Sequence, residues 1–190
     1  LATAIKQGDE ARHASLHDPL TGLPNRALFN DRLEHGLAAA NRNGLHFAVM
    51  FLDVDDFKAI NDALGHAAGD MILRTIAIAL KGFMRRPGDL AARYGGEEFC
   101  LMLPNITNEM ALEIAERLRL SVENSPDYKV IGIKRVTISL GLASIQFGIN
   151  NPSELINLAD KALYLAKNNG RNRVVVWNGE LDSKSQAISV

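Results

Sequence analysis

The feature that most constrains this chain is an unbroken apolar run, FAVMFL, at residues 47–52. A short run without polar alternation suits a β-strand that is buried on both faces. Such a strand needs a sheet that is covered on both sides. The run ends in acid, at Asp53, Asp55 and Asp56. A buried strand is therefore predicted to deliver carboxylates to the edge of a sheet, where α/β proteins tend to place ligands.

The segments around this strand are predicted to be helices and further strands. Helices are predicted at residues 25–41, 68–85, 111–122 and 155–166, and strands at 90–94, 98–103, 136–145 and 174–177. Gly95 and Gly96 separate two of these strands and favour a hairpin. We therefore expect a central sheet with helices, in which a hairpin interrupts the alternation of strand and helix.

The chain is expected to have three parts. Residues 1–16 are polar and compatible with a helix, and they have no core of their own, so they are predicted to be the end of a linker helix. Turn-forming prolines and a glycine at residues 18–25 mark the start of the globular domain. We assign residues 17–178 to this domain and residues 179–190 to a tail.

The composition excludes several classes of function. The 190 residues carry 21 basic and 22 acidic side chains, a net charge of −1, which gives no general reason to bind nucleic-acid polymer or a membrane surface. No apolar run approaches the ~18 residues of a membrane span. The one cysteine, Cys100, lies in an apolar run and is expected in the core. We expect a cytoplasmic domain, within a protein that could be anchored through regions outside this sequence.

The acids at the end of the apolar run suggest a metal site. Three carboxylates within four residues resist full ionisation unless a cation neutralises them. Mg²⁺ is held by one or two carboxylates together with substrate phosphates. The alternative is a solvated acidic turn that caps a helix beginning near Asp56.

The hairpin adds two carboxylates, Glu97 and Glu98, to a turn whose glycines would let a nucleotide lie against the backbone. Charged residues also follow ordinary Gly-Gly turns. With its flanks, the word RYGGEEF at residues 93–99 resembles the signature of the GGDEF family of diguanylate cyclases. The resemblance extends over almost all of residues 18–177, through DPLTGLPNR at 18–26, FLDVDDFK at 51–58, TISLG at 137–141 and ADKALYLAKNNGRN at 159–172.

This resemblance implies a fold and a set of metal ligands. The fold is an α+β, five-stranded sheet with surrounding helices, related to the palm of nucleotide polymerases and cyclases. The ligands are Asp53, Glu97 and the carbonyl of Val54, and two Mg²⁺ or Mn²⁺ ions per active site are implied. Glu98 is a further ligand or the base for the 3′-hydroxyl, and the sequence does not decide between Glu97 and Glu98 for that proton.

The resemblance also implies how GTP is bound. Phosphates are expected beside Phe57, Lys58, the backbone at Gly96, and the cations Lys167 and Arg171. Alternatively, Lys58 is a solvated helix residue, and Lys167 and Arg171 favour a helix C-terminus.

Guanine is expected to be read by Asn61 and Asp70, because a carboxamide and a carboxylate complement its N1–H, N2–H₂ and O6 edge. Their alternatives are a helix-end residue and an acid in a first helical turn. His66 is expected to be a structural loop residue rather than a metal ligand. Asp56 departs from many relatives, which carry an aromatic residue there.

The implied reaction condenses two GTP molecules into cyclic di-GMP and releases pyrophosphate. Because the product has two equivalent phosphodiester links, a two-fold homodimer matches its symmetry. The linker would connect an upstream sensor, and a downstream phosphodiesterase domain could follow. Arg86 and Asp89 resemble the family's RxxD product-inhibition motif, unless they are solvated loop charges. The competing functions are a catalytically silent receptor for cyclic di-GMP and a GTP-sensing regulatory domain.

Overall fold

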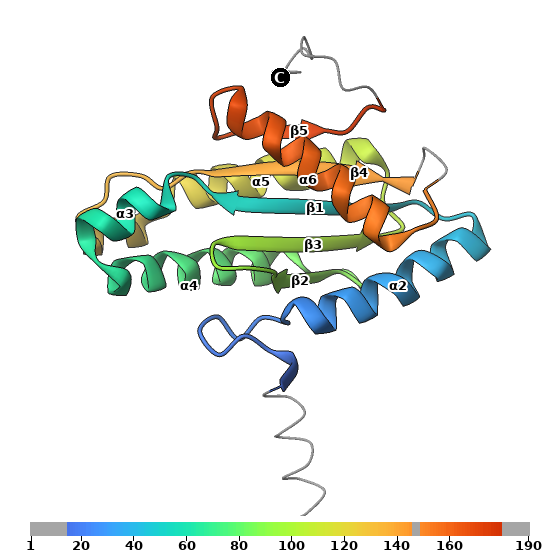
Figure 1. Cartoon of the computed structure of the whole chain (residues 1–190), viewed down its shortest axis with the longest axis horizontal. Helices are drawn as coiled ribbons and strands as arrows, with labels where there is room; N and C mark the ends of the chain where they lie inside the picture. The colour runs from blue at the N-terminus through green and yellow to red at the C-terminus, as the bar shows by residue number, and fades with distance from the viewer. Residues whose placement is uncertain (1–14, 146–148, 180–190) are drawn as a thin grey trace, which may run out of the picture.

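The computed structural model describes residues 15–145 and 149–179, which form one sheet with helices on both faces (Figure 1). The predicted linker helix lies almost entirely outside the described residues, as does the predicted tail. In chain order the elements are α2 (Arg26–Asn43), β1 (Phe47–Val54), α3 (Phe57–Leu64), α4 (His66–Phe83), β2 (Leu90–Arg93), β3 (Glu98–Pro104), α5 (Asn108–Glu123), the 3₁₀ helix η1 (Pro126–Ile131), β4 (Ile138–Ser144), α6 (Pro152–Asn168) and β5 (Val174–Val176).

The sheet has five strands in the order β2-β3-β1-β4-β5. The pairs β2/β3, β3/β1 and β1/β4 are antiparallel, and only β4/β5 is parallel. The hairpin gives the antiparallel β2/β3 pair, and the parallel β4/β5 pair is connected through α6, so the sheet is mixed. The α+β class and the five-stranded sheet are therefore confirmed.

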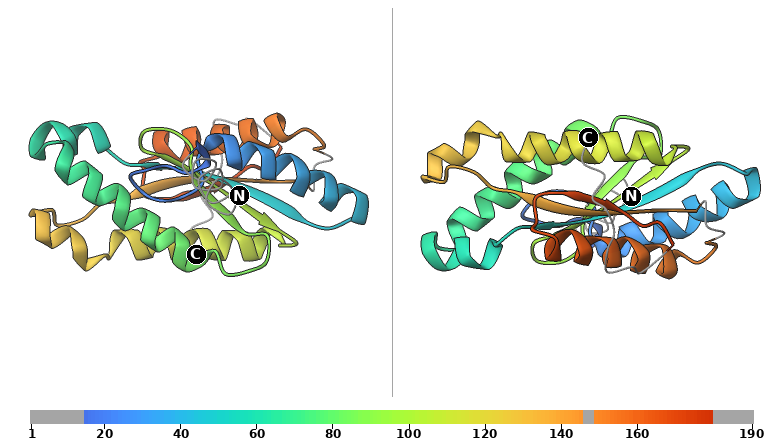
Figure 2. Two further views of the ribbon diagram at one scale, coloured as in Figure 1. Left: turned by 90° about the horizontal axis from the view of Figure 1, so that it is seen from below. Right: turned by 90° about the horizontal axis from the view of Figure 1, so that it is seen from above.

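Strand β1 is the centre of the molecule. All eight of its residues are buried, and alternate side chains enter two separate cores. One core lies under α4 and α5 and receives Met50 and Leu52, while the other lies under α2 and α6 and receives Val49 and Phe51. Figure 2 shows the two helix layers on opposite sides of the sheet. The apolar run of the sequence is thus explained by burial on both faces.

Most predicted elements are found within a few residues of their expected bounds. Asn25 caps α2 by accepting from the Leu28 N–H, and Gly44 ends that helix in the left-handed region, with φ of 61°. The prediction was incomplete after β1, where α3 and α4 are separate helices divided by Gly65. The 3₁₀ helix η1 was not predicted; it begins at a proline and is anchored by buried Tyr128.

Two expectations about environment can also be compared with the structure. Cys100 is buried in the core under α2 and α6, as expected. Within residues 15–145 and 149–179, no helix has the length and apolar character needed to cross a membrane.

Helix α6 packs on β4 at Gly141 with almost no space between the two backbones. A Cβ atom at position 141 would lie 2.0 Å from the Ala159 carbonyl oxygen and 2.2 Å from the Leu163 nitrogen. Both neighbours are backbone atoms of α6, which cannot turn aside as a flexible side chain can. The absence of a side chain at Gly141 therefore sets how closely α6 approaches the sheet.

Gly141→Ala is expected to destabilise the protein by about 1–3 kcal/mol or more, because the added methyl group must push α6 off the sheet. The measurement is the free energy of unfolding from denaturant titration. Gly82→Ala is the matched control, since a Cβ at this position in α4 meets nothing within 4 Å and alanine favours a helix. Equal stability of the two variants would contradict this account of the α6 contact.

Candidate active site

The acidic residues of β1 and the hairpin meet because of strand register. In the β1/β3 ladder Asp53 is the partner of Glu98, so the end of the buried strand lies beside the start of β3. The Val54 N–H donates to the Glu97 carbonyl oxygen over 3.3 Å, which fastens the hairpin turn to β1. Asp53 and Glu97, 44 positions apart in the sequence, therefore lie together with Glu98 in the fold. We call these three residues the acidic edge.

A cation from α6 lies at this edge. The Lys167 Nζ is 2.8 Å from the Asp53 Oδ1, and the two side chains are 34% and 9% exposed. Burial raises the pKa of Asp53 to about 6; Lys167 opposes this shift, whereas the nearby charges of Glu97 and Glu98 reinforce it. Positive charge stabilises the ionised form of a carboxylate that lies buried next to two others. The acidic edge therefore favours the binding of a cation.

The hairpin turn is clamped by Arg93. Its guanidinium donates to the Gly96 carbonyl oxygen from Nη2 over 2.7 Å and from Nε over 3.1 Å. On its other side Nη1 donates to both carboxylate oxygens of Asp18, over 3.0 and 3.2 Å. Burial works to raise the pKa of Asp18, but hydrogen bonds from Thr21 and the charge of Arg93 outweigh it and lower that pKa. The turn is thus tied to the segment where the domain begins.

Gly95 makes room for the Glu98 carboxylate. A Cβ at position 95 would lie 2.2 Å from the Glu98 Oε2, whereas a Cβ at Gly96 would meet nothing within 4 Å. Neither glycine has a positive φ. The first glycine of the pair is therefore needed for the position of Glu98, while the second leaves the outer side of the turn open.

The three aspartates at the end of β1 and just after it have different surroundings. Asp55 is buried and accepts hydrogen bonds from the hydroxyls of Thr137 and Ser139, each over 2.7 Å. Asp56 is exposed, has a φ of 54°, and makes no side-chain cap for α3. Its Oδ1 lies 3.4 Å from the Arg171 Nε. Asp56 thus fits the alternative of a solvated acid at the start of α3, although its side chain makes no capping hydrogen bond, and Asp55 is a structural carboxylate rather than part of the acidic edge.

The remaining predicted nucleotide residues lie on α3 and α4, at the end of β1. The Phe57 side chain is buried, so only its backbone is available to a phosphate, whereas Lys58 is exposed. Asn61 is packed against Gly69, where a Cβ would lie 2.0 Å from its Oδ1, and it is thus next to the helical position before Asp70. Among the described residues this buried Oδ1 has no hydrogen-bond partner. His66, the first residue of α4, is exposed.

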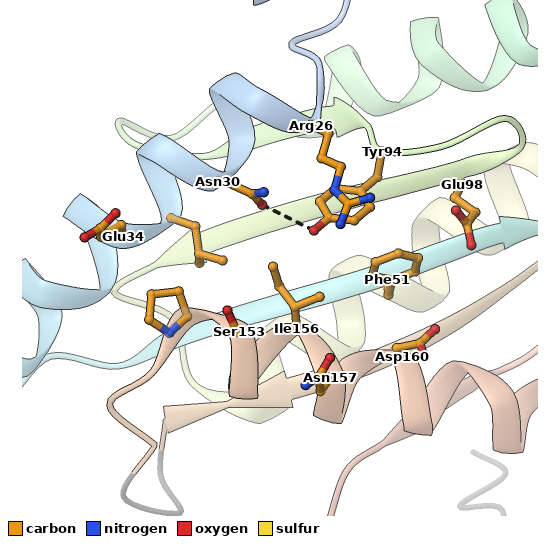
Figure 3. A pocket seen from close by; sticks show the side chains of 12 residues that line it. Arg26, Asn30, Glu34, Phe51, Tyr94, Glu98, Ser153, Ile156, Asn157 and Asp160 are labelled. Atoms are coloured by element: carbon orange, nitrogen blue, oxygen red, sulfur yellow. Dashed lines mark hydrogen bonds between the residues drawn. The ribbon is translucent and has the colours of Figure 1, made fainter.

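A groove of about 650 Å³ runs between α2 and α6 and reaches the acidic edge at Glu98 (Figure 3). Its floor includes Phe51 and Tyr94; the Arg26 guanidinium lies 4.6 Å from the centre of the Tyr94 ring. Glu98 and Asp160 line the groove on the right side of Figure 3. The sequence did not reveal this groove although several of its residues lie in the motifs quoted above, because only the folded chain brings these separate motifs together.

Asp89 is the less accessible member of the predicted inhibitory pair. Its side chain is 1% exposed and accepts from the Arg86 N–H over 3.0 Å, and the Arg86 Nε lies 3.6 Å from its Oδ1. Arg86 also donates to the carbonyl oxygens of Pro104 and Asn105. Burial raises the pKa of Asp89, against the influence of Arg86. Arg86, with 34% of its side chain exposed, is the member that faces solvent.

The donor set fits a divalent metal that is bound together with a substrate. Within the described ranges no group of three or more His, Cys, Asp or Glu side chains is arranged to hold a metal ion. Asp53 and Glu97 with the Val54 carbonyl would supply only hard oxygen ligands and only part of a coordination shell. This matches Mg²⁺, which keeps waters and takes substrate phosphates as its remaining ligands.

Two residues of the site were present in the predicted motifs but had no assigned role. Arg93 and Asp18 hold the turn, and the signal that could have identified them is an arginine just before a Gly-Gly turn together with an Asp-x-x-Thr word. The latter is the pattern of an aspartate that accepts from a residue three positions later. Thr21 donates to Asp18 from both its N–H and its hydroxyl, over 2.8 and 2.7 Å.

Comparison with known proteins agrees with this site. The chain is 43% identical over 163 residues to the probable diguanylate cyclase DgcT of Escherichia coli, covering 84% of the chain and 35% of that protein. It is 40% identical over 168 residues to the diguanylate cyclase DgcP of Pseudomonas aeruginosa, covering 88% and 25%. The chain thus spans only about a quarter to a third of the length of these relatives.

The fold comparison gives the same result. A crystal structure of the coiled coil and GGDEF domain of DgcB from Caulobacter crescentus, in complex with c-di-GMP, superposes with a TM-score of 0.84 at 31% identity and covers 92% of each chain. The family model described as "Diguanylate cyclase, GGDEF domain" matches residues 15–173. With its acidic edge, its clamped Gly-Gly turn and this match over most of its length, the chain belongs to the GGDEF domain family of diguanylate cyclases.

Proposed function

We propose that this domain condenses two GTP molecules into cyclic di-GMP and releases pyrophosphate. The observation that carries the proposal is the convergence of Asp53, the Glu97-Glu98 turn and Lys167 at one edge of the sheet. Carboxylates there would hold divalent cations, and a lysine from α6 would meet the phosphates that those cations bind. A silent receptor for cyclic di-GMP has no need to keep both kinds of group together, because its ligand carries no triphosphate.

The proposed metal ligands are Asp53, Glu97 and the Val54 carbonyl, and the proposed ions are two Mg²⁺ or Mn²⁺ per site. The family uses divalent metals. Bound there, such ions lower the pKa of an attacking hydroxyl and stabilise a leaving pyrophosphate. The chain's own contribution is to hold the carboxylates in register and to neutralise phosphate charge with Lys167, Arg171 and Lys58.

Glu98 is the better candidate for the base that accepts the 3′-hydroxyl proton. It lines the groove between α2 and α6, so its carboxylate faces a space through which a nucleoside can approach. Its position is also fixed, since it lies against the turn where Gly95 has no side chain. Glu97 remains the proposed metal ligand.

Guanine is proposed to bind between α3 and α4, at Asn61 and Asp70. The buried, unpartnered Oδ1 of Asn61 supports this, because a buried acceptor without a donor is costly unless a ligand supplies one. The Gly96 and Phe57 backbones would lie beside the phosphates. The distances of 2.8 Å between Lys167 and Asp53 and 3.4 Å between Arg171 and Asp56 support a phosphate site beside the end of β1 and the loop that follows it.

Catalysis is proposed to require a two-fold homodimer, because each GTP must attack the other. The DgcB structure was determined in complex with c-di-GMP, which supports cyclic di-GMP as the product and as a ligand of this domain. We further propose a cytoplasmic domain that is controlled by an upstream sensor through residues 1–16. A downstream phosphodiesterase domain in the whole protein is part of the same proposal.

Incubation of the chain with GTP and Mg²⁺, followed by chromatography, tests the function directly. Cyclic di-GMP and pyrophosphate are the expected products. Uptake of cyclic di-GMP without turnover would instead identify a silent receptor, and uptake of GTP alone would identify a regulatory domain.

Glu97→Gln is expected to lower the rate of cyclic di-GMP formation by roughly 100-fold or more, because a neutral amide is a poor ligand for Mg²⁺. The measurement is the initial rate at saturating GTP and Mg²⁺. Glu113→Gln is the control, since Glu113 lies on α5 in an exposed pair with Arg117. A Glu97→Gln rate above about a tenth of the wild-type rate would remove Glu97 from the ligand set.

Asp70→Ser is expected to reduce the preference for GTP over ATP, because the serine hydroxyl cannot accept from N1–H and N2–H₂ together as a carboxylate can. Sites that match such donors discriminate by roughly 10⁴-fold in favourable cases. The kcat/KM values for GTP, ITP and ATP on both proteins make the test. If the wild type uses ATP and GTP equally well, Asp70 does not read the base.

Arg86→Ala is expected to leave the initial rate nearly unchanged but to weaken inhibition by cyclic di-GMP, because Arg86 is the exposed member of the proposed product site. Contact of product with Asp89 would additionally require the Arg86–Asp89 pair to open. Progress curves with and without added product give the readout, with calorimetric titration of the product beside them. Arg85→Ala is the neighbouring control. If cyclic di-GMP inhibits all three proteins equally, Arg86 and Asp89 do not form a product-binding site.

A further inference from the structure

The turn that follows α6 has an unusual backbone. Arg171 and Asn172 are consecutive residues with positive φ angles, 61° and 46°. Asparagine enters this left-handed region more readily than most residues, but arginine does not. A conformation of this kind persists only where surrounding contacts determine it, and such places are often functional.

Asn172 is held through its backbone N–H and through both polar atoms of its side chain. Its N–H donates to the Asp55 Oδ2 over 3.0 Å. Its Oδ1 accepts from the Arg119 Nη1 over 2.8 Å, and its Nδ2 donates to the Glu123 Oε1 over 3.1 Å. The turn is therefore fixed from two directions, by the end of β1 and by α5.

Asp55 is the buried acceptor of this arrangement. Its Oδ2 accepts from both Asn172 and the Thr137 hydroxyl, and its Oδ1 accepts from the Ser139 hydroxyl. These donors lie between 82 and 117 positions away in the sequence. One carboxylate thus joins the loop after β1, the start of β4 and the turn after α6, and none of the roles proposed above uses it.

The consequence falls on Arg171, the residue immediately before Asn172. Its guanidinium lies beside the loop after β1, with Nε at 3.4 Å from the Asp56 Oδ1. Half of the side chain is exposed, so packing alone does not direct it. Its backbone belongs to the left-handed turn, and its guanidinium forms the ion pair with Asp56, so the conformation of the turn bears directly on where Arg171 can reach.

We infer that Asp55 and Asn172 are positioning residues that aim Arg171 at the triphosphate of the bound nucleotide. The inference rests on the proposed function, in which Arg171 binds phosphate. Asp55 acts through the backbone of Asn172 and touches no substrate. Its role is distinct from that of Asp53, although only one residue separates them.

The test uses binding of a non-hydrolysable GTP analogue with Mg²⁺, compared with binding of GMP, by calorimetry. Arg171→Ala is expected to weaken analogue binding roughly tenfold, the scale of one charge-assisted hydrogen bond. Asp55→Asn, which keeps the size but offers a donor where acceptors are needed, is expected to cause most of the same loss. In both variants the Kd for GMP is expected to change by less than about twofold.

A second variant covers the case in which Asp55→Asn does not fold. Asn172→Gly accepts a positive φ without cost and keeps the N–H that donates to Asp55, but it loses the contacts with Arg119 and Glu123. It is also expected to weaken binding of the analogue selectively. Asn169→Gly, on the same turn, removes an exposed carboxamide and is the matched control.

The decisive measurement combines each variant with Arg171→Ala. If Asp55 and Asn172 act through Arg171, the second substitution adds less than about twofold to the loss. Full additivity, equal loss of GMP binding, or analogue binding that is unchanged in both positioning variants would overturn the inference. Failure of the wild type to bind the analogue, or an Arg171→Ala protein that binds normally, would instead overturn the proposed phosphate role itself.

Discussion

The antiparallel register between β1 and β3 is the constraint on which the site depends. It sets Asp53 opposite Glu98, so carboxylates from two motifs become neighbours without any direct bond between their side chains. Side chains alternate along a strand, and a slip of one residue would send Asp53 to the other face of the sheet. The two cores prevent that slip, because β1 is apolar on both faces and each face is matched to its own helices. The packing of apolar side chains on both faces of β1 therefore determines where the carboxylates of Asp53 and Glu98 lie relative to each other.

This geometry carries an electrostatic cost that the chain balances locally. Burial and two neighbouring glutamates raise the pKa of Asp53 to about 6, and the Lys167 ammonium at 2.8 Å opposes them. Asp55, two residues later, is satisfied by neutral donors instead. Asp53 and Asp55, separated only by Val54, thus have different roles: the Asp53 carboxylate remains at the acidic edge, and the Asp55 carboxylate bonds to two other segments of the chain.

Much of the fold could be predicted because local pattern and burial agree. The apolar run of β1, the Gly-Gly hairpin and the helical segments are each specified by nearby residues. Helix α3 was not among the predicted helices, because it has only eight residues and Phe57 is its one buried side chain, which gives too little helical periodicity to recognise. The role of Asp55 could not be predicted, since its partners lie 82 or more positions away and only the folded chain brings them together. At Asp18 the Asp-x-x-Thr word was a local signal, but the ion pair with Arg93 joins residues that are 75 positions apart. The burial of the Asp89 side chain was also missed, because its exposed fraction of 1% depends on how the folded loop packs and no local pattern signals it.

The close contact at Gly141 has a consequence for how this site can change through evolution. Because α6 rests on β4 through backbone atoms, the height of the helix above the sheet does not depend on the volume of any side chain at that point. Substitutions elsewhere in the core under α2 and α6 can alter packing while this reference height stays the same. Lys167 lies on the same helix, so its distance from the sheet is set by the same backbone contact. Hydrophobic residues of this core can therefore be substituted while the distance between Lys167 and Asp53 stays the same.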